Sequence, residues 1–128
     1  MNNLVVDTSA WVEYFSGSEK GRKVEQIISN NTFLLTSGVI ILEVAVNDLK
    51  QGHDPALHTQ AILSMARTIA FDSTLGLKTA NLYVTLRKKK EKTSMSDAHI
   101  VAIAAVHHAA ILTCDFDFSG LPHTTVIR

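Results

Sequence analysis

The sequence has few of the features that mark secreted, membrane-bound or disulfide-bonded proteins. It contains one cysteine, Cys114, among 128 residues, which excludes an internal disulfide and a metal site built from several cysteines. The longest strongly apolar runs, residues 39–42 and 100–106, are far too short to cross a lipid bilayer. No basic and apolar leader opens the chain. These absences predict a cytoplasmic protein that makes no contact with a membrane.

The sequence also lacks nucleotide-binding loops and a net charge. No GxGxxG or GxxxxGK pattern occurs, so nothing favours a nucleotide-binding fold. The 12 basic residues balance the 12 acidic ones. Four acids nevertheless lie beside or inside apolar runs, namely Asp7, Glu43, Asp97 and Asp115. If these four bind metal together, eight acids remain to face twelve basic residues, and the surface keeps four excess positive charges. The neutral balance is therefore compatible with a nucleic-acid substrate.

Strand-like and helix-like segments alternate along the chain. Short apolar segments predict strands at 4–6, 33–36, 69–71, 111–114 and 124–127. Capping residues and apolar stripes predict helices at 10–15, 19–29, 38–50, 55–67, 73–90 and 97–109, with Ser96 as the cap of the last and a turn at Asn30 and Asn31. This alternation predicts an α/β fold of three layers, α/β/α, around a mostly parallel sheet of about five strands. No repeat or linker divides residues 1–128, so we expect a single domain.

Glu43 is the most informative of the four acids. It lies in the middle of an apolar helical segment, GVIILEVAVNDL, and shares a helix face with Val39, Ile40 and Val46. A charge in that position is costly unless it is paired or coordinated. The alternative is that Glu43 lies at the rim of the apolar stripe with its carboxylate in water.

The other three acids lie where an α/β fold gathers its chemistry. Asp7 and Asp115 each follow a predicted strand directly, in LVVD and ILTCD, and the carboxyl ends of parallel strands share one edge of a sheet. Asp97 begins an alanine-rich helix that can lie close to the sheet, which would bring this acid near the same edge. The alternatives are that Asp7 only caps the helix that follows it and that Asp97 only offsets a helix dipole. Asp117 is a reserve candidate, or a turn residue.

Clustered carboxylates predict a metal site. They cannot all stay ionised without a counter-charge, and a hard divalent cation such as Mg²⁺ or Mn²⁺ prefers oxygen ligands. Sites of this kind usually act on phosphates, because the metal activates a water molecule and offsets charge on the phosphoryl oxygens. Thr8, Ser9 and Thr113 supply neutral oxygens that could hold a metal-bound water or orient a carboxylate.

Four segments in order along the chain resemble those of the PIN-domain ribonucleases, and most closely the VapC toxins of toxin–antitoxin pairs. They are VVDTSAW (5–11), ILEV (41–44), SMSDAHIVAIAA (94–105) and AAILTCDFDF (109–118). The resemblance implies that Asp7, Glu43, Asp97 and Asp115 form the acidic quartet of the family, with Asp7 and Asp97 in direct contact with Mg²⁺. Thr8 or Ser9 would then match the hydroxyl after the first acid, and Thr113 the hydroxyl before the last.

The function that this resemblance implies is hydrolysis of RNA. We expect a Mg²⁺-dependent endoribonuclease, with Mn²⁺ as a possible substitute, that leaves a 5′-phosphate and a 3′-hydroxyl. We also expect a homodimer and a cognate antitoxin protein, whose Arg or Lys would pair with Asp7 or Asp97 while its flanking residues lie beside the first helices.

Other functions stay open at this point. They are a housekeeping PIN-domain nuclease and a non-catalytic phosphate-binding or receiver-type domain. An aspartyl-phosphate phosphatase needs an acid where Ser9 stands. A receiver domain needs an acidic pair after its first strand and a late functional lysine, and both are missing.

The remaining polar and aromatic residues suggest less. His107 and His108 are adjacent and point about 100° apart on a helix, and His99 is expected to face away from Asp97, so a zinc site is disfavoured. The aromatic residues of 11–15 are expected in the core rather than at an interface. The basic run 87–92, RKKKEK, is either a solvated helix end or a patch that steers RNA phosphates.

Overall fold

A five-stranded parallel β-sheet forms the centre of the molecule. The computed structural model describes residues 3–30 and 33–128. Within these residues the strands are β1 (Asn3–Val6), β2 (Phe33–Ser37), β3 (Ala66–Ile69), β4 (Ala109–Thr113) and β5 (Thr124–Val126). They lie side by side in the order β3–β2–β1–β4–β5, and every pairing is parallel. The predicted parallel sheet is confirmed.

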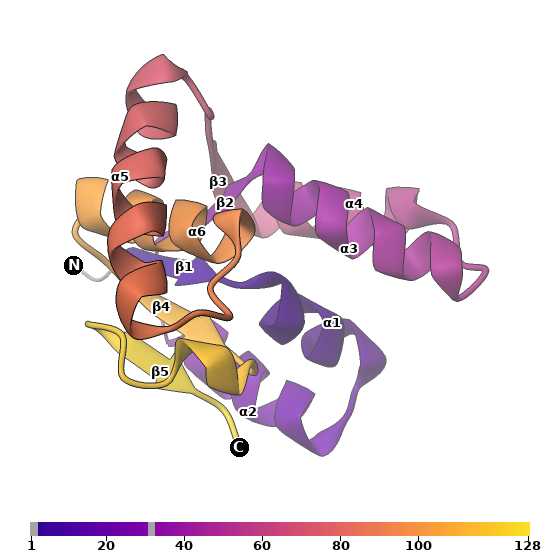
Figure 1. Ribbon diagram of the computed structural model, residues 1–128. Coiled ribbons are helices and arrows are strands. Elements are labelled where there is room, and N and C mark those ends of the chain that lie inside the picture. Colours follow the sequence, from indigo (N-terminus) through magenta and orange to yellow (C-terminus); the bar gives the residue numbers. More distant parts are fainter. Residues whose placement is uncertain (1–2, 31–32) are drawn as a thin grey trace.

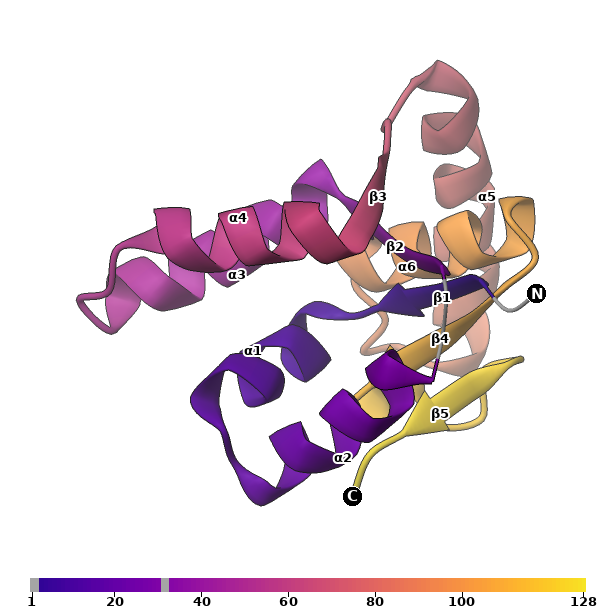
Figure 2. The same cartoon turned by 180° about the vertical axis from the view of Figure 1, so that it is seen from behind.

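Helices cover both faces of this sheet. The described residues form α1 (Thr8–Ser16), α2 (Glu19–Ser29), α3 (Gly38–Lys50), α4 (Pro55–Met65), α5 (Ser73–Lys89) and α6 (Met95–Val106), with a short 3₁₀ helix, η1 (Phe116–Phe118). Figures 1 and 2 show α2 on one face and α5 and α6 on the other. The predicted three-layer α/β/α fold is therefore confirmed. No helix in residues 3–30 and 33–128 is both long and apolar enough to span a membrane.

Burial on both faces explains the continuous apolar strands of the sequence. Leu4, Val5 and Val6 are all buried, because helices pack above and below β1. Trp11 is completely buried on α1, as predicted for the core, and stacks on the ring of Phe15. The core therefore forms between the sheet and its two helical layers.

The hairpin of α3 and α4 extends away from the sheet as an arm (Figures 1 and 2). A hydrogen bond of 2.8 Å joins His58 Nδ1 on α4 to the buried Asp48 Oδ1 on α3. The ring of His58 also stacks on Phe15, with 4.0 Å between the ring centroids. These two contacts hold the arm together and fasten it to α1.

Several predicted element boundaries are wrong. The fourth helix ends at Met65 rather than near residue 67, and the strand after it is Ala66–Ile69 rather than 69–71. β3 is an edge strand whose residues Arg67 and Thr68 face solvent, so its sequence lacks the apolar run that marks the inner strands. The last long helix begins after Ser94 rather than after Ser96. Of the turn predicted at Asn30 and Asn31, Asn31 lies outside the described residues.

The winding direction of the sheet reverses at its central strand. β2 pairs with one side of β1 and β3 pairs with β2, whereas β4 pairs with the other side of β1 and β5 pairs with β4. Open α/β sheets hold their ligands outside the carboxyl ends of the strands at such a reversal. The residues that follow β1 and β4 occupy this position.

Candidate active site

Asp7 lies at the carboxyl end of β1, held against the end of β4. Its backbone N–H donates to the carbonyl of Leu112 over 2.9 Å, which continues the parallel pairing by one residue. The side chain is only 6% exposed. Its Oδ2 accepts hydrogen bonds from Thr113 Oγ1 at 2.8 Å and from Ser9 Oγ at 2.9 Å. Two hydroxyl groups therefore fix one oxygen of a nearly buried carboxylate.

The same two hydroxyls shape the turn that follows β4. Ser9 Oγ accepts from the backbone N–H of Cys114 at 3.0 Å, and Thr113 Oγ1 accepts from that of Asp115 at 2.9 Å. The two side-chain oxygens also lie 3.1 Å from each other. Ser9 and Thr113 thus connect the first acid to the backbone of the last one, and they orient a carboxylate, as one of the two predicted roles requires.

Glu43 bridges two other parts of the site from the middle of α3. Its Oε1 accepts from Thr8 Oγ1 and from Ser96 Oγ, each at 2.9 Å. Thr8 follows Asp7, and Ser96 precedes Asp97. The side chain is half-buried, although Val46 on the expected apolar face is 40% exposed. Glu43 therefore holds the segments that carry two other acids.

Asp97 and Asp115 each take part in capping a helix. Asp97 Oδ2 accepts from the backbone N–H of Ser94 at 3.1 Å, while Ser94 Oγ accepts from the N–H of Asp97 at 3.0 Å. This reciprocal pair is a capping box at the start of α6. Asp115 Oδ1 accepts from the N–H of Asp117 at 2.9 Å and caps η1. Each of these carboxylates can cap a helix and also face the site, because only one of its two oxygens accepts the capping hydrogen bond.

The acids influence one another electrostatically. Burial raises the pKa of Asp7 above its ordinary value, and the negative charge of Asp97 raises it further, although hydrogen bonds from Thr113 and Ser9 act in the opposite direction. Burial likewise raises the pKa of Asp97, with added repulsion from Asp115 and Asp117. Among residues 3–30 and 33–128, no lysine or arginine forms an ion pair with these carboxylates. We call this edge of the sheet, with Asp7, Glu43, Asp97 and Asp115, the acidic edge. Its negative charge is not offset by an ion pair with lysine or arginine among the described residues.

The carboxylates are near one another without being closed around a common point. In the described part of the chain, no three His, Cys, Asp or Glu side chains converge as a ready-made metal site. Asp7 and Asp115 belong to one hydrogen-bonded set with Ser9 and Thr113, and Glu43 belongs to a second set with Thr8 and Ser96. The donor chemistry, carboxylate and hydroxyl oxygens with no basic partner, nevertheless fits a hard divalent cation.

Comparison with known families identifies the fold. A family model described as "PIN domain" matches residues 4–123. The chain belongs to the PIN-domain family.

Named relatives of this PIN domain are ribonucleases. It is 27% identical over 131 residues to VapC ribonuclease Mb1587 of Mycobacterium bovis and to Ribonuclease VapC11 of Mycobacterium tuberculosis, with 98% of this chain and 96% of each relative covered. Among solved structures it is similar to a toxin–antitoxin complex from Klebsiella pneumoniae, with 24% identity, 98% of both chains covered and a TM-score of 0.74. It is also similar to VapC20 of Mycobacterium tuberculosis, described as a Sarcin-Ricin loop cleaving toxin, with 20% identity, 98% and 99% coverage and a TM-score of 0.76. The two structures show the fold.

His99 and its partners Ser37 and Ser96 hold the acidic edge of the PIN domain through contacts that were not predicted from the sequence. His99 is 2% exposed, its Nδ1–H donates to the carbonyl of Ser96 at 2.6 Å, and Ser37 Oγ donates to its Nε2 at 2.8 Å. This tautomer follows because a carbonyl can only accept. Burial lowers the pKa of His99, which favours the neutral ring. His99 thus connects the first turn of α6 to the start of α3. No sequence signal marks this contact, whereas the spacing of Ser94 and Asp97 is a capping-box pattern.

The other histidines and the basic run lie elsewhere in the PIN domain. His107 ends α6, and its carbonyl accepts from Asn3 Nδ2 at 2.9 Å, which places it at the amino-terminal edge of the sheet. The basic run ends α5 and continues into the loop before α6. Lys90 Nζ donates to the carbonyl of Asp117 at 3.3 Å, so part of this run lies beside the loop after β4.

Proposed function

We propose that this PIN domain is a divalent-metal-dependent endoribonuclease and the toxin of a toxin–antitoxin pair. The proposal rests on the carboxylates of β1, α3, α6 and the loop after β4, which are joined by hydroxyl hydrogen bonds or mutual repulsion and have no basic partner among the described residues. The ribonuclease names of the relatives that match along the whole chain support the substrate class. Asp7, Glu43, Asp97 and Asp115 are the proposed catalytic residues.

Asp7 and Asp97 are the proposed direct ligands of Mg²⁺ or Mn²⁺, with Asp115 and Glu43 completing the acidic quartet. When bound, such an ion lowers the pKa of water and offsets negative charge on the phosphoryl oxygens. The chain prepares the site by holding its carboxylates in place. Hydrogen bonds from Thr113 and Ser9 fix Asp7. A hydrogen bond from Thr8 helps to fix Glu43.

Burial and mutual repulsion oppose the ionisation of Asp7 and Asp97 in the folded protein. A divalent cation held by these carboxylates would offset that penalty. Hydrolysis then leaves a 5′-phosphate and a 3′-hydroxyl on the products, as the family resemblance implies.

Cleavage of labelled RNA in Mg²⁺, Mn²⁺ and chelator tests the proposed activity. Asp7→Asn and Asp97→Asn should each lower the rate by more than about 100-fold while the protein stays folded by circular dichroism. Asp54→Asn is the matched control, because Asp54 caps α4 far from the acids and asparagine caps equally well. Full activity in chelator, or an equal loss in the control, would contradict a metal-dependent site.

We further propose that a cognate antitoxin restrains the enzyme. One solved neighbour, from Klebsiella pneumoniae, is described as a toxin–antitoxin complex. The acidic edge lacks a basic partner within the described residues, and an arginine or lysine of an inhibitor would supply one. The flanking residues of that inhibitor would lie beside α1 and α3, where a recess of about 70 Å³ is lined by Val12, Phe15 and Val44 together with polar residues such as Asn47 and Asp48.

We also propose that the toxin is a cytoplasmic homodimer in which each chain forms a single domain. Induction in cells should arrest growth, and co-expression of the adjacent reading frame should restore it. Unchanged growth, together with RNA cleavage by the purified protein and no binder in that reading frame, would leave a housekeeping nuclease instead. A monomer by light scattering at micromolar concentration would contradict the homodimer.

A further inference from the structure

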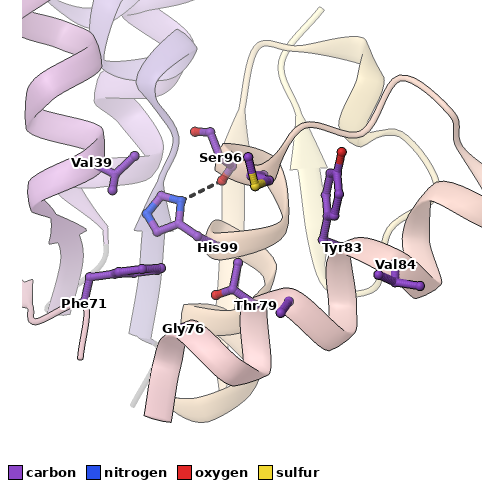
Figure 3. Close-up of a pocket in the computed structure, with 10 residues that line it drawn as sticks. Val39, Phe71, Gly76, Thr79, Tyr83, Val84, Ser96 and His99 are labelled. Atoms are coloured by element: carbon purple, nitrogen blue, oxygen red, sulfur yellow. Dashed lines mark hydrogen bonds between the residues drawn. The ribbon is translucent and has the colours of Figure 1, made fainter. Parts of the chain in front are cut away.

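An apolar pocket of about 380 Å³ lies between α5, the first turn of α6 and the start of α3. Its volume is near the lower end of the roughly 300–1,000 Å³ typical of small-molecule sites. Figure 3 shows Phe71 and Tyr83 on either side of His99, which lies between them. The pocket therefore offers space for one small planar group between aromatic side chains.

The polar groups in the pocket wall are already bonded to other parts of the protein. Thr79 Oγ1 donates to the carbonyl of Leu75 at 2.7 Å, and Ser96 Oγ donates to Glu43 at 2.9 Å. Both ring nitrogens of His99 are engaged, as the dashed bond to Ser96 in Figure 3 shows for one of them. The wall thus offers ring faces and methyl groups, and an occupant would be held by stacking and exclusion of water.

The pocket and the acidic edge share the first turn of α6. Ser96 lines the pocket, donates to Glu43 and directly precedes Asp97. His99 lines the pocket as well and holds the same helical turn. A polymer whose phosphodiester reaches Asp97 would therefore present its neighbouring nucleoside to the pocket.

Arg87 places one positive charge beside Tyr83 in the wall of the pocket. Arg87 Nη1 donates to Tyr83 Oη at 2.7 Å, and its guanidinium lies 5.5 Å from the centroid of that ring. The basic run continues from Arg87 through Lys88, Lys89 and Lys90. An aromatic pocket with a cation beside it complements a stacked base that carries a phosphate, and it suits an apolar peptide less well.

We propose that this pocket binds one nucleobase of the RNA, next to the phosphodiester that is cleaved. The inference rests on the proposed ribonuclease function and names how that site would select its substrate. The base is held chiefly by its ring faces and its size, because Thr79, Ser96 and His99 already use their donors within the protein. Arg87 contacts the adjacent phosphate.

Binding of RNA to the Asp7→Asn variant tests the pocket directly. The probe is a short fluorescent oligoribonucleotide that is also assayed for cleavage by the wild-type protein, together with copies that each carry one abasic nucleotide. Loss of the stacked base should weaken binding roughly 5- to 150-fold at one position beside the cleavage site and little elsewhere.

A second variant fills the pocket without disturbing the fold. A Cβ added at Gly76 would lie 3.9 Å from Phe71 Cε1, an ordinary contact, and leucine is a better helix former than glycine. Gly76→Leu, added to Asp7→Asn, should weaken binding of intact RNA by a similar factor and should abolish the effect of the abasic position. Asn81→Leu is the matched control, because Asn81 is exposed on the same helix and does not line the pocket.

The outcomes separate this inference from the proposed function. Cleavage by the wild-type protein with an equal effect of abasic nucleotides at every position would overturn the pocket and leave the ribonuclease. Position-dependent binding without cleavage would overturn the ribonuclease and leave the pocket. Absence of RNA binding would overturn both. If Gly76→Leu changes the molar mass in light scattering and leaves RNA binding unchanged, the pocket is a contact between copies of the chain and the proposal is wrong.

Discussion

At the scale of single residues, the acidic edge combines ionisable groups with burial that opposes their ionisation. Burial raises the pKa of Asp7 and of Asp97, and each acid also feels a negative neighbour. Groups of this kind stabilise a fold only while they are protonated, or while a cation accompanies them. Without a cation, the acidic edge therefore lowers the stability of the protein near neutral pH.

The pH dependence of stability follows from the direction of these shifts. For an acid whose pKa is higher in the folded state, the stabilising contribution is present below the unfolded pKa and is lost as pH rises through the folded pKa. The wild-type protein without metal should therefore lose stability as pH rises above the ordinary value of 3.8 for aspartate. Asp7→Asn should lose less, and should melt higher than the wild type at pH 7.

Thermal unfolding of both proteins across this pH range, in chelator, measures the difference. Asp54→Asn again serves as the control, since Asp54 is exposed and caps α4. A wild-type protein that melts above Asp7→Asn at neutral pH without metal would show that Asp7 stabilises the fold as an ion.

At the scale of elements, two serines at the start of α6 have different roles: one caps the helix, and the other contacts the acidic edge. Ser94 is the cap and exchanges hydrogen bonds with Asp97, whereas Ser96 donates to Glu43. The sequence interpretation assigned the cap to Ser96, because this serine directly precedes the acid. Two serines at this spacing allow either register, and the reciprocal bond with the third helical residue favours Ser94.

Alanine at each serine should therefore have a different effect. Ser94→Ala removes a helix cap and should lower the free energy of unfolding by about 0.5–2 kcal/mol. Ser96→Ala should cost less stability, yet it should lower RNA cleavage about 10- to 100-fold, because it releases a carboxylate that supports the metal ligands. Chemical denaturation and cleavage rates measured on the same preparations test both halves. If Ser96→Ala lost more stability than Ser94→Ala, and Ser94→Ala lost more cleavage than Ser96→Ala, the result would contradict the observed cap.

The inner elements of the sheet were predictable because burial on both faces leaves a strong apolar signal. β1 and β4 follow that pattern, and the acids after them could be placed at one edge from the parallel topology alone. β3 is an edge strand with Arg67 and Thr68 exposed, so the apolar signal was weak and its boundary was misplaced.

At the scale of the whole molecule, the contacts that assemble the acidic edge are long-range. Glu43 meets Ser96 across 53 residues, and Ser37 meets His99 across 62. Local pattern carries no information about such pairs, because it depends only on neighbours in the chain. The hydroxyls of Thr8, Ser9 and Thr113 could be singled out because they stand beside the acids in the sequence, whereas the contacts of Ser37, Ser96 and His99 required the structure.

The central claim is that the carboxylates of four segments act together as one site for a divalent cation. Thermal unfolding at pH 7 with increasing Mn²⁺ tests it most directly, because an ion that binds only the folded protein raises the melting temperature by mass action. The account predicts a saturable rise for the wild type and for Asp54→Asn, and a strongly reduced rise for Asp7→Asn and for Asp97→Asn. An equal rise in all four proteins, or none in the wild type, would contradict it.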